Sequence, residues 1–365
     1  MRNRFLTSFV VLGVLGCHSG SGGAGAGGAT TATCSPSDPT CFSFSHTFST
    51  QTVAPGQEIQ SLCQIYTLNN PAEIWVNGVT LDNQGAYHHS NWFFVPNTDS
   101  TYAAQPDGAW DCSTFDEIST ALAGGVLYAQ STQVTHEVQA FPPGTAVRIP
   151  PWSRIVGQTH LLNTSTAPVT TSMTLGVASI PAAQVTVKLA PFQLIYHDLH
   201  LPPKASSDFS ASCDFAGAAQ AINEPFSFHL YYVLPHYHLL GTGFSFNHFG
   251  GPSDGVQIAS APAYNAEPDG KAFDPAVDMT QDKGASFRCA YDNTTASEVT
   301  WGLGGHEMCE MLGFSDSSLA FVGEVNDGTG MVTGMAGGTV QNSGPCSVTA
   351  LHWDQNKPGG MPPAP

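Results

Sequence analysis

The sequence predicts an all-β protein made of two tandem antiparallel β-sandwiches, jelly-roll-like and bridged by disulfides. Short runs rich in β-branched and aromatic residues recur between Gly, Pro, Asn and Asp residues, as in proteins with many short strands. Long helical periodicity is scarce, and roughly 330 residues remain after the N-terminal segment, which is more than one core usually covers. Short strands without long helices favour sandwiches, and the length favours two of them.

The strand-like runs are spread along the whole chain, at residues 73–79, 145–149, 169–177, 184–189, 226–234 and 320–325. Residues 112–123 are the only fair helical candidate, and the sequence shows no convincing internal repeat. We expect an N-terminal domain at residues 34–188 and a C-terminal domain at residues 189–350. Residues 351–365 are rich in Pro and Gly and are expected to be disordered.

The first residues have the pattern of an export signal. Arg2 and Arg4 precede an apolar run that ends just before Cys17. A small residue before that cysteine is typical of a signal, residues 1–17, that is cut ahead of a lipidated Cys17. Residues 18–33 are mostly Gly, Ser and Ala and predict a flexible tether. We expect an exported bacterial lipoprotein of the cell envelope, anchored to a lipid membrane through Cys17 on the periplasmic or surface side of the outer membrane; an uncleaved anchor is the alternative.

The charge balance argues against one class of partner. The chain has a formal net charge of −18, and no cluster of Lys or Arg follows the signal. An acidic surface repels phosphate backbones, so we expect no nucleic-acid partner.

The cysteines indicate a disulfide framework. An even number remains once Cys17 is taken by the lipid, and zinc sites would normally show CxxC pairs, which this chain lacks. Counting alone does not pair them. The remaining cysteines are Cys34, Cys41, Cys63, Cys112, Cys213, Cys289, Cys309 and Cys346.

Five imidazoles and one thioether have the chemistry of copper ligands. They are His88, His89, His160, His236, His238 and Met308. Imidazole suits both copper oxidation states and a thioether favours Cu(I), so this order predicts two separate copper sites. His236 and His238 follow a strand-like run, where alternation sends residues two apart to one face. His88 and His89 are adjacent and need a bend to reach one ion, which Gly85 just upstream permits.

Short motifs surround these ligands in both halves of the chain. They are YHH at 87–89, QTH at 158–160, PHYHLLG at 235–241, RCAYDN at 288–293 and GHEMC at 305–309. Over about residues 60–346, most closely in the second half, they resemble the type II copper, ascorbate-dependent monooxygenases. This is the family of peptidylglycine alpha-hydroxylating monooxygenase and dopamine beta-monooxygenase, with its His-His pair and its Gln-x-His, HxHxLG, Cys-x-Tyr-Asn and EMC elements.

The resemblance implies two copper ions per chain, one in each domain, facing each other across an open solvent cleft. The implied ligands are His88, His89 and His160 for an electron-storing copper, and His236, His238 and Met308 for an oxygen-binding, catalytic copper. Gln158 and His306 would support these ligands without binding metal. The implied reaction hydroxylates a C–H bond of a small organic substrate with dioxygen and a reductant such as ascorbate.

The resemblance also implies the disulfide pairs. They are Cys63 with Cys112, Cys213 with Cys346 and Cys289 with Cys309, which leaves Cys34 with Cys41. The pair at Cys309 would hold the residue next to Met308, so it would position a ligand as well as stabilise the fold.

Three positions that bear on the substrate depart from the peptide-amidating enzymes, and Ser90 stands where those enzymes carry Met after the His pair, which matters little for metal binding. Leu234 stands where they carry Arg, and Glu310 and Leu312 stand where they carry the Asn and Tyr that hold a substrate carboxylate. An acid at Glu310 repels a carboxylate, so glycine-extended peptides are not expected as substrates. We expect Glu310 to be a solvated acid; a site for a cationic amine is the alternative.

Two other functions fit the same residues. One is a copper-binding or copper-sensing lipoprotein without turnover, and the other is a structural β-sandwich adhesin with incidental histidines. Six filled ligand positions favour the enzyme, because a pure binder needs only one site. Oxygen uptake that depends on a reductant and yields a hydroxylated product would distinguish the enzyme from the copper-binding lipoprotein. Stoichiometric copper would exclude the structural adhesin.

Overall fold

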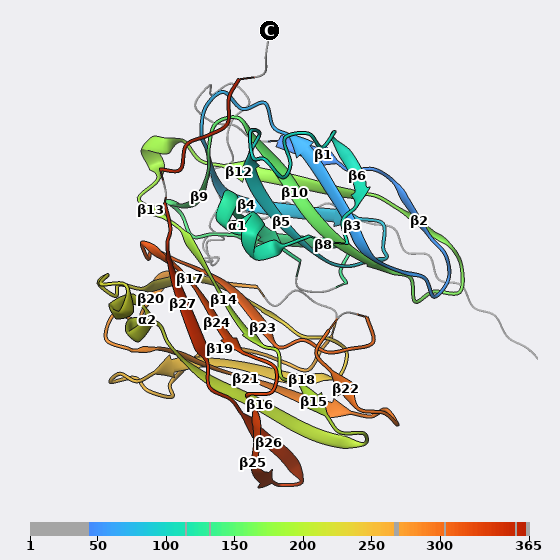
Figure 1. Cartoon of the computed structure of the whole chain (residues 1–365), viewed down its shortest axis with the longest axis vertical. Coiled ribbons are helices and arrows are strands. Elements are labelled where there is room, and N and C mark those ends of the chain that lie inside the picture. The colour runs from blue at the N-terminus through green and yellow to red at the C-terminus, as the bar shows by residue number, and fades with distance from the viewer. Residues whose placement is uncertain are drawn as a thin grey trace, which may run out of the picture. The chain divides into compact units, whose positions relative to one another are not determined.

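A computed structural model describes residues 44–113, 115–130, 133–265, 270–302, 304–354 and 356–362. Within these residues the chain forms two β-sandwiches, which confirms the predicted all-β class (Figure 1). The expected signal, tether and lipid attachment at Cys17, and the cysteines Cys34 and Cys41, lie outside the described residues. None of the described helices is long and apolar enough to cross a membrane.

The first sandwich consists of the strands coloured blue to green in Figure 1. One sheet has the order β1-β12-β4-β9-β13 with β8 beside β4, the other has the order β6-β3-β10-β5-β7, and β2 pairs with β11. Strand β12 shows why these residues form sheets: alternate residues Met173, Leu175 and Val177 are buried and the residues between them are not. The elements are β1 Phe44–Thr47, β2 Gln51–Val53, β3 Glu58–Thr67, β4 Ile74–Asn83, β5 Tyr87–Pro96, β6 Gly108–Asp111, α1 Glu117–Ala123, β7 Gly125–Ala129, β8 His136–Ala140, β9 Thr145–Ile149, β10 Ser153–Leu162, β11 Val169–Thr171, β12 Met173–Ser179, the 3-10 turn Ala182–Gln184 and β13 Val187–Lys188.

The second sandwich follows directly along the chain. Its two main sheets have the orders β20-β17-β23-β14-β24-β27 and β19-β18-β21-β16-β26-β25, and β15 pairs with β22. The elements are β14 Ala190–Tyr196, β15 His200–Leu201, β16 Ala205–Asp214, α2 Phe215–Ala221, β17 His229–His236, β18 Gly241–Phe249, β19 Gln257–Ala261, β20 Lys271–Asp278, β21 Gly284–Asn293, β22 Val299–Thr300, β23 Glu310–Ser315, β24 Leu319–Val325, β25 Met331–Ala336, β26 Thr339–Ser343 and β27 Ser347–His352.

Some predicted elements differ from those observed. The helical candidate 112–123 is helical only as α1, where Asp116 caps the first turn by accepting from Ser119 N at 3.0 Å. The run at 184–189 contributes only the two residues of β13, and α2 was not expected.

Strand β17 is buried on both faces. Val233 and Tyr237 pack into the core of the second sandwich, whereas Tyr232 and Leu234 join the core cluster of the first. Phe141 of the first sandwich shows this contact directly, because its ring centroid lies 5.6 Å from that of Tyr232. Part of the outer face of this sheet is therefore covered by apolar residues of the first sandwich, and the two sandwiches share an apolar core there.

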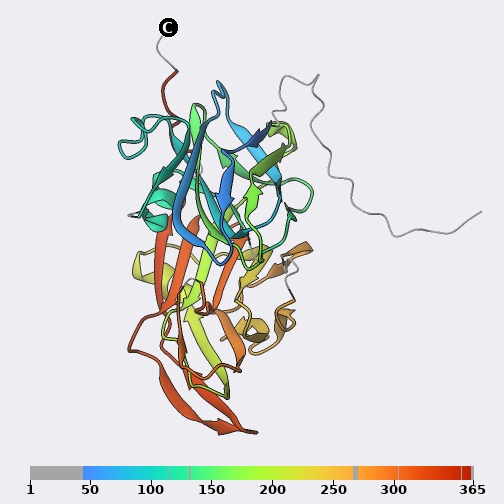
Figure 2. The same ribbon diagram turned by 90° about the vertical axis from the view of Figure 1, so that its right-hand side faces the viewer.

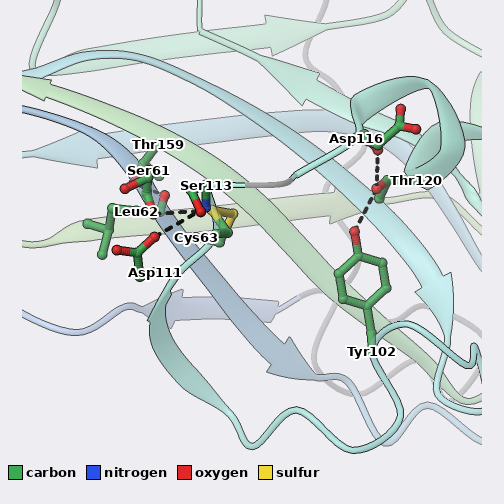
Figure 3. Close-up of a disulfide and its surroundings, with 10 residues drawn as sticks. Ser61, Leu62, Cys63, Tyr102, Asp111, Ser113, Asp116, Thr120 and Thr159 are labelled. Carbon is green, nitrogen blue, oxygen red and sulfur yellow. Dashed lines mark hydrogen bonds between the residues drawn. A yellow bond between two sulfur atoms is a disulfide. The ribbon is translucent and has the colours of Figure 1, made fainter.

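Three disulfides crosslink the described residues, and they are the three pairs that the resemblance implied. Cys63–Cys112 fastens β3 to the end of β6, next to the hydrogen bond from Thr159 to Leu62 O, as Figure 3 shows. The other pairs are Cys213–Cys346 and Cys289–Cys309. Disulfides of this kind indicate a protein that folds in an oxidising compartment, as exported proteins do.

Each sandwich contains the same corner, which was not recognised as a repeat in the sequence. Asn163 directly follows β10 and donates to the carbonyls of Val53 and Ala167, both at 2.9 Å. Asn293 ends β21 and donates to the carbonyls of Leu201 at 2.8 Å and Ser297 at 2.9 Å. In both cases the buried amide joins a short strand pair, β2-β11 or β15-β22, to the end of a long strand.

The C-terminal residues correct the expectation of disorder at 351–365. β27 continues to His352, and Arg148 of the first sandwich donates to Lys357 O at 2.9 Å. The side-chain amide of Asn97 then donates to Met361 O at 2.8 Å and accepts from Met361 N at 3.0 Å. These hydrogen bonds order the described part of a segment whose composition alone favours a coil.

The hairpin β25–β26 projects from the second sandwich in both views, at the red end of the colour bar (Figure 2). Met331, Val332 and Met335 are 62%, 67% and 71% exposed. These three residues are thus more exposed than any other large apolar residue in the described strands.

Candidate metal centre and adjoining cavity

Strands β5 and β10 bring three of the predicted ligands together. His160 pairs with His89 in the register of these strands, whereas the next residue, Leu161, pairs with Tyr87. His88 is therefore the extra residue of a β-bulge, which lets two adjacent imidazoles turn toward the same place. The ring centroids of His88 and His89 lie 5.3 Å apart, and each lies within 5.0 Å of the His160 ring.

Strand β17 presents the remaining two imidazoles. His236 ends this strand and shares a face with Tyr232 and Leu234, the face that packs against the first sandwich. His238 follows two residues later, with its ring centroid 5.1 Å from that of His236. The two predicted metal ligands thus occupy one side of the chain here, as the alternation of a strand predicts.

The five rings form one cluster, so in this structure the two ligand sets are not separated. The ring centroid of His88 lies 5.1 Å from that of His238, and the ring centroid of His89 lies 5.3 Å from that of His236. This differs from the expected pair of sites across an open solvent cleft. The physical reason is the burial of the β17 face, because Tyr232 and Leu234 belong to the core of the first sandwich. One ligand atom from each of His88, His89 and His238 lies within 4.8 Å of the others.

Hydrogen bonds fix the orientation of several rings. His160 Nε2 lies 2.7 Å from Glu58 Oε1, and His160 Nδ1 lies 3.1 Å from His89 Nε2. His238 Nδ1 donates to the carbonyl of His306 at 2.8 Å. The Nε2 atoms of His88 and His238 are buried without a hydrogen-bond partner among the described residues. Two buried nitrogens of this kind call for a partner that the described residues do not supply.

Burial keeps these imidazoles neutral. It lowers the pKa of His160 to about 4, and it lowers the pKa of His89 and His238 well below the ordinary value, helped by the neighbouring histidines. The pKa of His88 is lowered by the same cause. A neutral imidazole has a free lone pair, which is the form that binds metal.

Glu307 organises the second half of the cluster and was not identified from the sequence. Its side chain is 1% exposed and accepts from His238 N at 2.9 Å and from Leu240 N at 2.7 Å. Burial raises the pKa of Glu307 to about 7, although these N–H donors favour its ionised form. The signal that could have found it is the position of this acid between His306 and Met308 in the GHEMC motif.

Met308 is held from two sides by residues of β21. Tyr291 donates its hydroxyl to the carbonyl of Met308, and Cys289 forms the disulfide with Cys309. Asn293 of the same strand forms the corner described above, so every named residue of the Cys-x-Tyr-Asn element faces inward. The Met308 side chain is 6% exposed, and it lines a cavity together with His89 and His236.

That cavity has a volume of about 490 Å³ and is bounded by residues of both sandwiches. Gln158, two residues before His160 on β10, lines it, as do the three positions that depart from the peptide-amidating enzymes, Leu234, Glu310 and Leu312. Glu310 is not a solvated acid as expected: it is partly buried, and burial together with the charge of Glu117 raises its pKa to about 8. Glu117 was likewise missed, since it lies in the short helix α1 with no motif around it.

His306 supports the cluster through its main chain. Its exposed ring contacts Thr300 at 3.1 Å, and only its carbonyl reaches His238. Several histidines away from the cluster are paired with acids, as in His229 with Asp316 at 2.8 Å and His248 with Asp282 at 2.6 Å. Glu58 could not be found from sequence, because it reaches His160 from β3, across the sheet.

The donor set fits copper. Five imidazoles and a thioether include no carboxylate ligand, and this combination suits copper better than a hard cation such as Mg²⁺ or Ca²⁺. The unpartnered Nε2 atoms of His88 and His238 come from different sandwiches, so an ion held by both would link them.

Comparisons with known proteins add no function. No family model matches the chain, and no curated protein matches it. Among solved structures it is similar to the major capsid protein P2 from bacteriophage PM2, at 8% identity and a TM-score of 0.29 over 75% of this chain and 97% of that one. It is also similar to a structure of broad bean stain virus, at 11% identity and a TM-score of 0.30 over 74% of this chain and 88% of that one. Similarity this low carries no argument about function.

Proposed function

We propose that the protein is an exported, copper-dependent monooxygenase that hydroxylates a C–H bond of a small organic substrate. The observation that carries this proposal is the convergence of buried, unpartnered Nε2 atoms of His88 and His238 beside His89. The cavity next to His236 and Met308 provides space for a substrate, which a protein that only stores copper does not need.

The six predicted ligands supply enough donors for two copper ions, and the proposal retains two per chain. Copper would supply the one-electron redox steps that hydroxylation by dioxygen requires. In the overall reaction one oxygen atom enters the substrate as an alcohol and the other leaves as water. Two electrons and two protons come from an ascorbate-like reductant. The residues of this chain fix the imidazoles through Glu58, His306 O and Glu307, and they hold the substrate in the cavity.

Copper content tests the metal part of the proposal. The purified protein should bind two copper ions, and the double variant His88→Ala with His238→Ala should lose at least one of them. Met308→Ala should weaken copper binding selectively for Cu(I), because the thioether is the soft ligand. His229→Ala and Met331→Ala are the matched controls, since these residues lie outside the cluster. Copper binding that is unchanged in the cluster variants would reject the site.

Turnover separates the enzyme from the alternative, a copper-binding or copper-sensing lipoprotein. Oxygen uptake that depends on reductant, and a hydroxylated product in stoichiometric amount, support the enzyme. Two bound coppers without such uptake would support the alternative.

The membrane anchor is part of the same proposal. The disulfides support folding in an oxidising compartment, and the sequence around Cys17 supports lipid attachment. Mass spectrometry of the N-terminal peptide from the membrane fraction should find Cys17 acylated, and Cys17→Ser should release the protein from membranes.

A further inference from the structure

A short loop of the second sandwich precedes Met308 and is closed by its own main chain. We call it the 302–307 loop, and the structure describes it at Gly302 and at residues 304–307. Gly302 N donates to Glu307 O, and Glu307 N donates to Thr300 O, both at 3.0 Å. These hydrogen bonds join the two ends of the loop, so its shape is set within the second sandwich.

One side of this loop holds an imidazole of the second sandwich. The carbonyl of His306 accepts from His238 Nδ1 at 2.8 Å, and the carboxylate of Glu307 accepts from His238 N at 2.9 Å. Any movement of the loop therefore moves the groups that orient His238.

The other side of the loop meets an acid of the first sandwich. Gly304 has a φ of +69°, and a Cβ atom at this position would lie 2.4 Å from Oε1 and 2.9 Å from Oε2 of Glu58. Glycine is needed here both for the backbone conformation and for space. Bare main chain of the second sandwich thus lies against the carboxylate that contacts His160 at 2.7 Å.

Neither side of this contact can move away without losing a hydrogen bond. Glu58 Oε1 lies 2.7 Å from His160 Nε2 and accepts from Gln60 Nε2 at 2.8 Å. A methyl group on residue 304 would displace either the carboxylate, which breaks its contact with His160, or the loop, which disturbs His238. In both cases a predicted metal ligand loses the partner that orients it.

We propose that Gly304 is a positioning residue of the metal centre, through which the second sandwich holds in place the acid that orients His160. The proposal deepens the proposed function and rests on it for the identity of the metal as copper. Its consequence is that the ligands His88, His89 and His160 of the first sandwich bind metal at full affinity only when the 302–307 loop is seated against Glu58.

Single glycine substitutions test the contact. Gly304→Ala should reduce copper affinity by about 10- to 100-fold, as the loss of a ligand's hydrogen-bond partner does, measured by competition with a chelator of known affinity. Gly328→Ala is the matched control for backbone strain, because Gly328 has a φ of +74° and no atom within 4 Å of its Cβ position. Gly305→Ala adds a methyl group to the same loop where no atom lies within 4 Å. Both controls should retain the copper affinity of the unchanged protein.

A double-mutant cycle separates the contact from strain within the loop. Once Glu58→Ala has removed the carboxylate, the further change Gly304→Ala should cost less than about a tenth of the affinity that it costs alone. A loss of equal size in both backgrounds, or no loss in Gly304→Ala, would overturn the proposal. Near-UV circular dichroism identifies a variant that fails to fold. Gly304→Asn then replaces Gly304→Ala, since Asn tolerates this φ and carries the same Cβ.

A measurement on the metal-free protein keeps the two proposals apart. Nitrogen-15 NMR of histidine-labelled protein reports which ring nitrogen of His160 carries the proton. We expect Nε2 in the unchanged protein and in Gly328→Ala, and a mixture of both forms in Gly304→Ala. If this change occurs but the unchanged protein binds no copper, the role of Gly304 stands and the proposed copper enzyme fails. If copper binds and Gly304→Ala alters neither its affinity nor the proton position, the metal centre stands and the role of Gly304 fails.

Discussion

Glu58 Oε1 lies 2.7 Å from Nε2 of His160, and this contact decides which nitrogen of the imidazole carries the proton. The carboxylate accepts a hydrogen bond from Nε2–H, so the lone pair of the neutral ring is on Nδ1, the atom that lies 3.1 Å from His89 Nε2. An acid that orients an imidazole in this way is a common partner of metal-binding histidines.

Removing this acid should weaken metal binding more than it weakens the fold. We expect Glu58→Ala to reduce copper affinity by about 10- to 100-fold, as loss of a ligand's hydrogen-bond partner does. Glu58→Gln should lose less, because its amide oxygen still accepts. Competition with a chelator of known affinity measures the change. Glu73→Ala, which breaks the ion pair with Arg148 in the same sandwich, is the control. An affinity that falls equally in the control would show a general loss of stability instead.

Glu307 should be a strong contributor to stability. Glu307→Ala leaves the N–H groups of His238 and Leu240 without their acceptor, which should lower the free energy of unfolding by about 2–4 kcal/mol. Glu307→Gln keeps one acceptor and should lose about half as much. Urea denaturation measures both, with Glu298→Ala as a surface control. A loss no larger than that of the control would mean that the two N–H groups find other acceptors.

The two asparagine corners should contribute separately. Asn163→Ala and Asn293→Ala each remove four side-chain hydrogen bonds, two of them donated to main-chain carbonyls, so each should lower the free energy of unfolding by about 1–3 kcal/mol. The effects in the double variant should add, because the corners share no partner. Chemical denaturation checks this, and the exposed Asn326→Ala is the control. Strong non-additivity would contradict independent corners.

Stability of the metal-free protein should fall as the pH is lowered from about 6.5 to 4. The pKa of His160 is about 4 in the folded protein and 6.5 ordinarily, so in this window the unfolded chain binds a proton that the folded chain does not. Stability therefore rises with pH across the window, by up to about 1.4 kcal/mol per pH unit for one such residue. Glu307 acts in the opposite sense. Its pKa is raised in the folded protein, so its contribution to the stability of the protein falls as the pH rises from 4.5 toward 7.

The contribution of His160 is isolated by comparing the protein with His160→Gln. The variant should show a shallower rise of unfolding free energy with pH between 4 and 6.5, measured by urea denaturation at several pH values. Parallel pH profiles for the two proteins would contradict a folded-state pKa that is lowered by burial.

The local parts of the structure were accessible from the sequence, and the long-range parts were not. The alternation in β17 predicts that His236 and His238 share a side, and the bend required by His88 and His89 is the observed bulge. Resemblance to known motifs supplied the three disulfide pairs, which spacing does not determine. These features depend on residues close in sequence or on short motifs.

The five histidines form one cluster because the face of β17 that carries Tyr232 and Leu234 packs against the first sandwich. Tyr232 and Leu234 look like residues of the strand's own sandwich, and nothing in the sequence says that they pack into the other one. Glu58 and Glu117 reach the site across a sheet and from a helix, so no local pattern marks them. Glu310 shows the same limit, because its burial depends on a cavity built from both halves of the chain.

The C-terminal segment has a practical consequence for handling the protein. The second sandwich is joined to the first by the chain before β14, and it is fastened again where Met361 binds Asn97. The second sandwich is therefore attached to the first at both ends of its chain. Loss of the second attachment raises the entropy of any state in which the two sandwiches have separated. An affinity tag appended near Met361 can disturb the hydrogen bonds between Met361 and Asn97, and a truncation before Lys357 removes them together with the bond from Arg148 to Lys357 O. Copper stoichiometry and ligand affinity are best compared on proteins that carry their tag elsewhere.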